Sequence, residues 1–196
     1  MYLKMKNGDL IVIPTDTVYG LAAKLHDLEA LDKIYEIKGR DFSKQIPILI
    51  SDRASLSDMV KMTPLALELT RNLWPGPLTI VFETKPQFFK LTGEKTVAIR
   101  LPNHPIACEI IDEFGPLRVT SVNKSGQPPL THIDDIKREF GPYLSKIYEQ
   151  DREPSNLSST VIDITGSEIK ILRRGIVTEE DIEDALIQYR RSYKQE

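Results

Sequence analysis

Short apolar runs alternate along this chain with segments in which apolar residues recur every three or four positions. An unbroken apolar run is typical of a buried strand, and the longer spacing is typical of a helix with one apolar face. Strands are expected at 10–13, 46–51, 76–84, 96–101, 117–122, 145–151, 158–165 and 168–175, and helices at 28–38, 63–74, 104–115, 132–141 and 178–194. The alternation predicts an α/β fold, and the consecutive strands late in the chain predict a mixed sheet with flanking helices.

Length and composition fit one globular domain. The chain has 196 residues, of which 40% are hydrophobic and 28% charged, and its formal net charge is −3. This charge gives no general reason for nucleic-acid binding. The sequence shows no signal region and no apolar span long enough for a membrane, so we expect a cytoplasmic protein without membrane contact. The single cysteine, Cys108, excludes an internal disulfide framework and a cysteine-based zinc cluster.

Polar side chains recur where the expected strands end. Ligand sites of α/β proteins form at strand ends on one side of the sheet, so we expect these side chains to converge. Cations together with hydroxyl and amide groups suit an anionic, oxygen-rich ligand such as a nucleotide phosphate. The residues concerned are Thr15, Asp16, Thr17, Arg100, Thr120, Ser121, Asn123, Ser158, Ser159, Thr160, Arg173 and Arg174, with Lys38 and Arg40 at the exit of a helix.

Each of these groups also has an ordinary structural explanation. Thr15 and Thr17 can close a turn through hydrogen bonds from side chain to backbone. Lys38 and Arg40 can complement the C-terminus of a helix. Asn123 begins a sequence that is typical of a β-turn. Only their repetition at several strand ends favours a shared site.

Common catalytic motifs are missing from the sequence. It contains neither a GxxxxGK[ST] phosphate loop nor a GxGxxG turn. The histidines, His26, His104 and His132, are not spaced as metal ligands, and no nucleophile has a base nearby in the sequence. We therefore expect catalysis by positioning and electrostatic stabilisation, as in phosphoryl and nucleotidyl transfer.

A set of short segments resembles the YrdC-like family of threonylcarbamoyl-AMP synthases. In order, they are IPTDTVYGLAA, KGR, WPGPLTIVF, TVAIRLPNHP, TSVNKSG, SSTVIDI and ILRRGIV. The resemblance implies a twisted α/β fold around a concave, positively charged cavity. It also implies a single domain over 1–196, with a motif-bearing core at about 8–178 and a C-terminal helix at about 178–194.

The same resemblance implies an enzyme, a nucleotidyltransferase that makes threonylcarbamoyl-AMP and pyrophosphate from L-threonine, bicarbonate and ATP. Mg²⁺ would arrive with ATP, near Ser121 and Asn123, without a metal site made by the protein alone. The product would pass to a tRNA threonylcarbamoyl-transferase complex that modifies adenosine 37, and direct RNA binding would be weak or absent.

Roles of individual residues also follow from the resemblance. The substrate amino acid would be held by Thr17, Tyr19, Arg100 and Ser159. ATP would be bound by Lys38, Arg40, Lys44, Thr96, Ser121, Asn123 and Arg173, and Lys38 and Arg40 would be catalytic.

Two alternatives stay open. One is a double-stranded RNA-binding module of the same fold, although the acidic balance speaks against sequence-specific binding of single strands. The other is a carbamoyl-transfer domain like that of hydrogenase-maturation proteins, which sits there beside zinc-finger-like and acylphosphatase-like segments that this sequence lacks. The polar stretch 151–159, which contains a proline, is expected to be a flap that becomes ordered over bound ligand.

Overall fold

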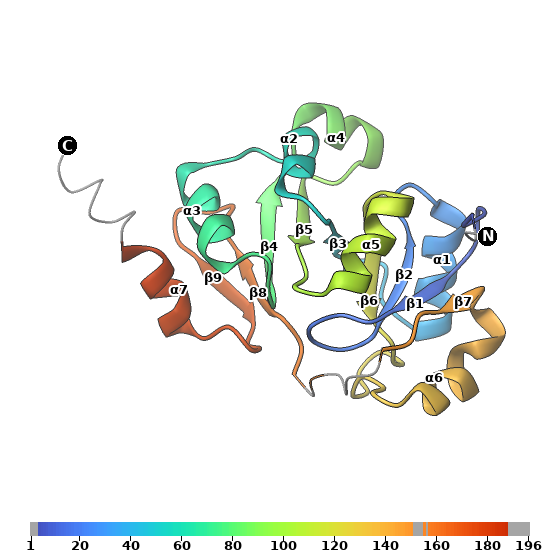
Figure 1. Cartoon of the computed structure of the whole chain (residues 1–196). Helices are drawn as coiled ribbons and strands as arrows, with labels where there is room; N and C mark the ends of the chain where they lie inside the picture. Colours follow the sequence, from blue (N-terminus) through green and yellow to red (C-terminus); the bar gives the residue numbers. More distant parts are fainter. Residues whose placement is uncertain (1–3, 151–154, 156, 188–196) are drawn as a thin grey trace.

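The structure is a computed structural model, which describes residues 4–150, 155 and 157–187. Within these ranges nine strands form one sheet in the order β7-β1-β2-β6-β3-β5-β4-β8-β9. Parallel pairs are β1/β7, β3/β5 and β4/β8, and the other neighbours are antiparallel. The predicted mixed α/β sheet with flanking helices is therefore confirmed (Figure 1).

The helices and strands have the following bounds. The strands are β1 (Ile11–Ile13), β2 (Gly20–Lys24), β3 (Ile48–Leu49), β4 (Leu78–Glu83), β5 (Thr96–Arg100), β6 (Leu117–Ser121), β7 (Lys146–Ile147), β8 (Thr160–Asp163) and β9 (Lys170–Arg173). The α-helices are α1 (Leu28–Lys38), α2 (Leu56–Met59), α3 (Pro64–Leu73), α4 (Pro86–Thr92), α5 (Pro105–Phe114), α6 (Ile133–Phe140) and α7 (Glu179–Ala185). No helix in the described part of the chain is long and apolar enough to cross a membrane.

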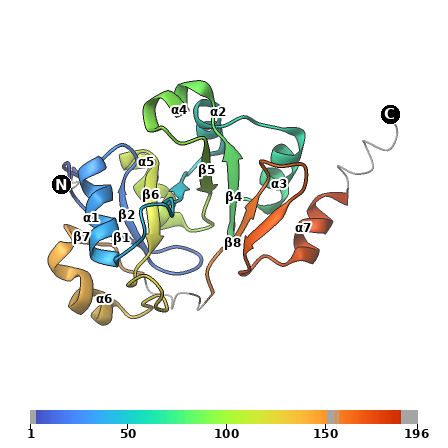
Figure 2. The ribbon, with the colours of Figure 1, turned by 180° about the vertical axis from the view of Figure 1, so that it is seen from behind.

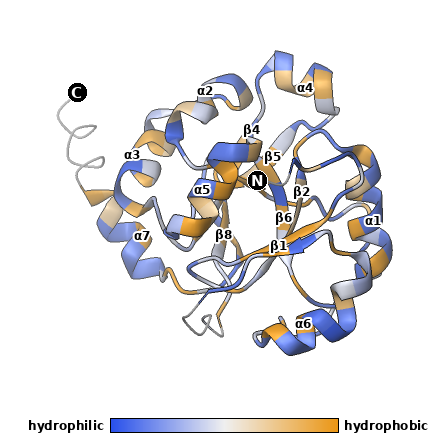
Figure 3. Ribbon diagram, turned by 45° about the vertical axis from the view of Figure 1, so that its right-hand side comes forward, coloured by the Kyte–Doolittle hydropathy of each residue, from blue (hydrophilic) through white to orange (hydrophobic). Residues whose placement is uncertain are grey.

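Three clusters of buried apolar side chains hold the helices against the sheet. One cluster joins β4, β5 and β8 to α2, α3, α4 and α7. A second joins β1 and β2 to α1 and α6, and a third joins β1 and β6 to α5. Val12 belongs to the second cluster and its neighbours Ile11 and Ile13 to the third, so β1 is covered by helices on both faces. The helices expose hydrophilic residues on their outer sides (Figure 3).

The other half of the sheet has one face that these helices leave uncovered. In β4, β5 and β8, every second residue enters the apolar cluster with α2, α3, α4 and α7. The residues between them line a cavity on the opposite face, as the pleat of a strand requires. Seen from behind, β4 and β8 lie in front of the helices in this half (Figure 2). The cavity-side residues are Thr79, Val81, Thr96, Ala98, Arg100, Val161 and Asp163.

Local signals predicted the helices well and several strands poorly. The helices expected at 28–38, 63–74, 104–115 and 132–141 are present as α1, α3, α5 and α6. The strand β2 was not predicted, because Gly20, Ala22 and Ala23 have low strand propensity, and α2 and α4 were also missed. The strands expected at 46–51 and 145–151 shrink to the two-residue strands β3 and β7.

Two expectations concern residues that the structure describes only in part. The helix expected at 178–194 begins as α7 and is described to residue 187. Thr178 caps it, because Asp181 N donates to Thr178 Oγ1 at 3.1 Å. Most of the proposed flap at 151–159 lies outside the described residues.

Gly175 provides a test of how β9 is held beside β8. A Cβ at Gly175 would lie 2.3 Å from the carbonyl oxygen of Ser158 and 2.5 Å from the backbone nitrogen of Thr160. Since these atoms are backbone, Gly175→Ala should lower the free energy of unfolding by about 1–3 kcal/mol, the usual cost of overpacking. Urea denaturation measures this. Gly166→Ala is the control, because its Cβ would meet only Glu168 O at 3.9 Å, and an equal loss in both variants would contradict the explanation.

Candidate active site

The uncovered sheet face forms the floor of a cavity of about 420 Å³. Eight of the eleven residues expected at the site line it: Thr17, Tyr19, Arg40, Thr96, Arg100, Ser121, Ser159 and Arg173. The remaining three, Lys38, Lys44 and Asn123, are not among the lining residues. The structure thus brings strand ends that are far apart in the sequence to one site, as the strand-end pattern predicted. The roles of the individual residues remain predictions.

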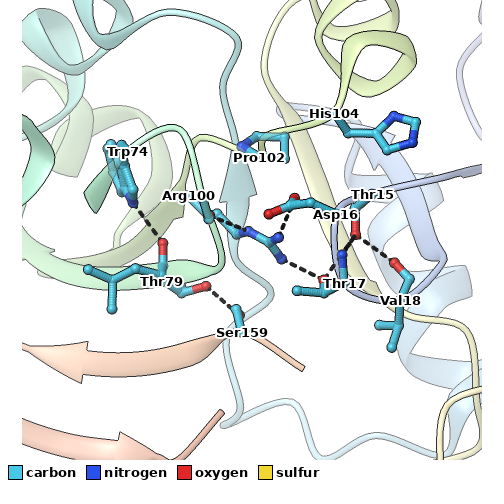
Figure 4. A network of polar contacts seen from close by, with 12 residues as sticks. Thr15, Asp16, Thr17, Val18, Trp74, Thr79, Arg100, Pro102, His104 and Ser159 are labelled. Atoms are coloured by element: carbon cyan, nitrogen blue, oxygen red, sulfur yellow. Dashed lines mark hydrogen bonds and ion pairs between the residues drawn. The ribbon is translucent and has the colours of Figure 1, made fainter. Parts of the chain in front are cut away.

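Arg100 forms the most enclosed part of the cavity wall. It is the last residue of β5 and only 5% exposed. Its Nη2 donates to Asp16 Oδ1 at 2.5 Å, its Nη1 to Thr17 Oγ1 at 2.8 Å and its Nε to Gly76 O at 3.1 Å (Figure 4). Burial lowers the pKa of the guanidinium, and the carboxylate of Asp16 opposes this shift. The ion pair with Asp16 therefore keeps a buried charge stable.

The hydroxyl groups after β1 have defined hydrogen-bond directions. Thr15 Oγ1 donates to Val18 O at 2.7 Å, so in its 3.0 Å contact with Thr17 Oγ1 the Thr17 hydroxyl is the donor. Thr17 Oγ1 at the same time accepts from Arg100. Thr15 therefore closes the turn, as one of the two explanations expected, and Thr17 lines the cavity, where its role in binding stays a prediction. Tyr19 is 2% exposed, and burial raises the pKa of its phenol.

Ser159 and Arg173 are in direct contact and both line the cavity. Arg173, the last residue of β9, donates from Nη2 to Ser159 Oγ at 3.0 Å and from Nε and Nη2 to Ser159 O. The Ser159 hydroxyl also lies 2.9 Å from Thr79 Oγ1 (Figure 4). Burial, followed by the positive charge of Arg40, lowers the pKa of the Arg173 guanidinium. Two arginines that repel each other across a cavity favour an anion between them.

Lys38 is held inside the protein and does not face the cavity. It is 2% exposed, and its Nζ donates to Ser121 O at 2.6 Å, to Asn123 O at 2.6 Å and to Asn123 Oδ1 at 3.0 Å. Burial, followed by the charges of Arg40 and Lys124, lowers the pKa of the Lys38 ammonium to about 8. All three N–H groups are used to fix the turn after β6, so direct contact with phosphate would require these bonds to break.

Arg40 and Lys44 belong to the loop after α1 but differ in position. Arg40 is half-buried and lines the cavity, and it donates from Nε to Lys44 O and from Nη2 to Gln45 O, both at 2.9 Å. The Lys44 side chain is exposed, and its backbone carbonyl supports Arg40. In the structure Lys44 therefore acts on the cavity through its main chain.

Sequence reasoning missed the cavity floor. Apart from Thr96 and Arg100, the floor residues of β4, β5 and β8 were not predicted, and neither was Leu172 of β9. The signal was present in the alternation of small or polar residues with large aliphatic ones along β4 and β5. This alternation distinguishes the face of each strand that packs under helices from the face that stays uncovered.

The described residues do not offer a dedicated metal site. No group of three or more His, Cys, Asp or Glu side chains that could hold a metal ion occurs among them. Near Ser121 and Asn123, the amide oxygen of Asn123 already accepts from the Ser121 hydroxyl at 2.6 Å and from the Lys38 ammonium. The Lys38 ammonium therefore occupies the place where Mg²⁺ was expected. Ser121 and Asn123 do not fit a resident metal ion.

Comparison with known proteins identifies the family. The family model for Sua5, YciO and YrdC, described as "Telomere recombination", matches residues 4–175. A putative threonylcarbamoyl-AMP synthase of Mycobacterium tuberculosis is 34% identical over 93% of this chain and 85% of its own length. The threonylcarbamoyl-AMP synthase of Bacillus subtilis is 33% identical over 91% of this chain and 53% of its own.

A solved structure agrees with this result. Pyrococcus abyssi Sua5 complexed with L-threonine superposes with a TM-score of 0.82 at 34% identity, over 92% of this chain and 54% of that one. The chain therefore belongs to the Sua5/YciO/YrdC family, and the resemblance seen in the sequence is confirmed.

The two lysines allow a test of which one supports the structure. Lys38→Met should lower the free energy of unfolding by about 3 kcal/mol, because each buried polar group left without its partner costs about 1–3 kcal/mol. Lys44→Met, in an exposed side chain, should have no measurable effect. Urea denaturation compares the two. Wild-type stability in the Lys38 variant would show that the three hydrogen bonds of its ammonium do not fix the turn.

Proposed function

We propose that this chain is a threonylcarbamoyl-AMP synthase, an ATP-dependent nucleotidyltransferase that uses L-threonine and bicarbonate. One observation carries the proposal: the cavity over the uncovered sheet face is lined by a buried arginine, Arg100, by hydroxyl groups, and by two further arginines, Arg40 and Arg173. The names of the relatives from Mycobacterium tuberculosis and Bacillus subtilis support the same activity.

In this proposal the Arg100 end of the cavity holds threonine. The guanidinium of Arg100 pairs with the carboxylate of the amino acid, and Thr17 and Ser159 provide hydroxyls of the kind that read a side-chain hydroxyl. Tyr19 contributes a buried, rigid wall. The Pyrococcus abyssi Sua5 structure, which contains L-threonine, supports a site for this amino acid in the fold.

The other end binds ATP. Arg40 and Arg173 pair with the phosphates, and Thr96 and Ser121, which also line the cavity, contact the nucleotide. Lys38 and Asn123 do not line the cavity, but their hydrogen bonds hold the turn that carries Ser121. Lys38 also adds positive charge near the phosphates. Lys44 supports Arg40 through its carbonyl.

The chemistry then needs little covalent participation by the protein. Bicarbonate loses its hydroxyl group, and the amine of threonine bonds to the resulting carbon dioxide to give a carbamate. The released hydroxide and the amine proton leave as water. A carbamate oxygen attacks the α-phosphorus of ATP, the bond to the β-phosphate oxygen breaks, and pyrophosphate leaves. Arg40 and Arg173, with Lys38 behind them, stabilise the negative charge on the phosphates. Mg²⁺ would enter only as the counter-ion of ATP.

The proposal includes several statements that rest on the family resemblance. These are a single domain over 1–196, a cytoplasmic location, transfer of the product to a tRNA-modifying complex, and a positively charged cavity. Three arginines and one aspartate line the cavity, which supports the last of these. RNA binding that falls steeply with salt and ignores ATP and threonine would instead favour the RNA-binding alternative.

Choice of amino acid tests the function. In a pyrophosphate-release assay with ATP and bicarbonate, threonine should be the best substrate. Serine should be about 10–200-fold worse, because a missing methyl group costs a small pocket about 1–3 kcal/mol. Valine should be worse than serine, because the pocket hydroxyls would be left unpaired. Faster turnover of valine than of serine would refute the hydroxyl-lined pocket, and no release with any amino acid would refute the function.

Arg40 tests the nucleotide end. Arg40→Ala should lower kcat/KM for ATP about ten- to a hundredfold, since a charge-assisted hydrogen bond contributes about 1.5–3 kcal/mol. Arg138→Ala, which removes an exposed arginine paired with Asp135 on α6, is the control and should keep wild-type kinetics. Unchanged kinetics for ATP in the Arg40 variant would remove this residue from the site.

A further inference from the structure

Asp16 is a carboxylate that neither the expected turn nor the expected ligand contacts explain. Its side chain is 15% exposed and pairs with Arg100, whose side chain is 6% exposed. Asp16 Oδ1 accepts from Arg100 Nη2 at 2.5 Å, whereas Oδ2 is buried without a hydrogen-bond partner among the described residues. A half-satisfied buried carboxylate costs stability, so its presence calls for a reason other than stability.

We propose that Asp16 is a positioning residue, which holds the guanidinium of Arg100 so that its remaining N–H groups meet the carboxylate of the substrate amino acid. This inference rests on the proposed function. It adds a residue that determines how strongly the enzyme selects an amino acid over the corresponding amine without a carboxylate.

The geometry of the guanidinium supports this role. Arginine has five N–H groups in one plane, and three are used here, one each by Gly76 O, Thr17 Oγ1 and Asp16 Oδ1. Each terminal nitrogen thus keeps one N–H without a partner in the described part of the chain. Three anchors from two segments, the loop after β1 and the turn before β4, fix both the position and the rotation of the plane. Figure 4 shows Arg100 held against Asp16 and Thr17. A planar donor held in this way suits a carboxylate, whose two oxygens lie in one plane.

Asp16 contributes the only charge among the three anchors. The Gly76 carbonyl and the Thr17 hydroxyl are neutral, and the guanidinium is too buried for water to stabilise its charge. Burial lowers the pKa of Arg100, and the carboxylate opposes this. Without Asp16, the guanidinium would be expected to turn toward other acceptors or toward solvent.

Asp16 has two opposing effects on the affinity for threonine, so the direction of change on removing its charge tells which effect is larger. The negative charge of Asp16 reduces the attraction of Arg100 for another carboxylate. If this were its main effect, removing the charge would tighten the binding of threonine. If positioning dominates, removing it weakens binding, because a misaligned guanidinium loses charge-assisted hydrogen bonds worth about ten- to a hundredfold in affinity. The three-point anchorage leads us to expect the weaker binding.

The experiment compares L-threonine with L-threoninol, in which an alcohol replaces the carboxylate. Calorimetry measures both affinities in wild-type protein, D16N, D16E and D27N. Asp27 is the matched control, since it is also a buried carboxylate but accepts from Gly8 N and Ala30 N at the start of α1. L-serine, which keeps the carboxylate and lacks the methyl group, is the control ligand.

The wild-type protein should prefer threonine to threoninol about ten- to a hundredfold, as expected for lost charge-assisted hydrogen bonds. In D16N this ratio should fall to a few-fold while the preference for threonine over serine stays. D16E, which keeps the charge, should have a threonine-to-threoninol ratio between those of D16N and the wild type. D27N should keep the wild-type ratio even if this variant unfolds more easily. An unchanged ratio or tighter threonine binding in D16N would overturn the role of Asp16.

A measurement on the wild-type protein covers the case in which D16N does not fold. In nitrogen-15 NMR spectra without ligand, the two terminal nitrogens of Arg100 should give separate signals, because both are held. Free rotation of this guanidinium would also overturn the inference. A wild-type protein that neither binds threonine nor releases pyrophosphate would instead refute the proposed function, and this inference with it.

Discussion

The guanidinium of Arg100 joins three parts of the chain that are far apart in the sequence. It is carried by β5, and it reaches the loop after β1 through Asp16 and Thr17 and the turn before β4 through the carbonyl of Gly76. An arginine buried this far is stable only when its charge is paired and its N–H groups have acceptors. The contacts that fix the loop against the sheet are therefore the same contacts that shape the Arg100 end of the cavity.

This arrangement requires a sheet face that no helix covers. On β4 and β5, large aliphatic side chains such as Ile80 and Ile99 pack under the helices, while Thr79 and Ala98 face the cavity. Apolar residues on both faces would require a further layer of helices. The covered face thus supplies most of the hydrophobic stabilisation, and the uncovered face can hold hydroxyls and charges that cost stability.

The sequence predicted what depends on near neighbours. The cap of Thr63 on Ala66 N and the stop at Gly39 are local, so α1 and α3 were found. β2 was missed because its strand state depends on β1 and β6 on either side, not on its own glycine and alanines. Within the site, the strand-end pattern found Arg100 and Ser159. It could not show that Lys38 turns inward, because the carbonyls that hold Lys38 lie at the end of β6 and just after it, far along the chain.

The strand order also sets the time at which the cavity can exist. β4 pairs with β5 soon after both have been synthesised, but its other neighbour is β8, and β9 comes later still. A chain that emerges N-terminus first therefore carries one wall of the cavity well before Ser159 and Arg173 have left the ribosome. Until then the edge of β4 that later pairs with β8 is unpaired and open to wrong partners. A ligand that spans both walls can stabilise only the last stage of folding, in which β8 and β9 dock.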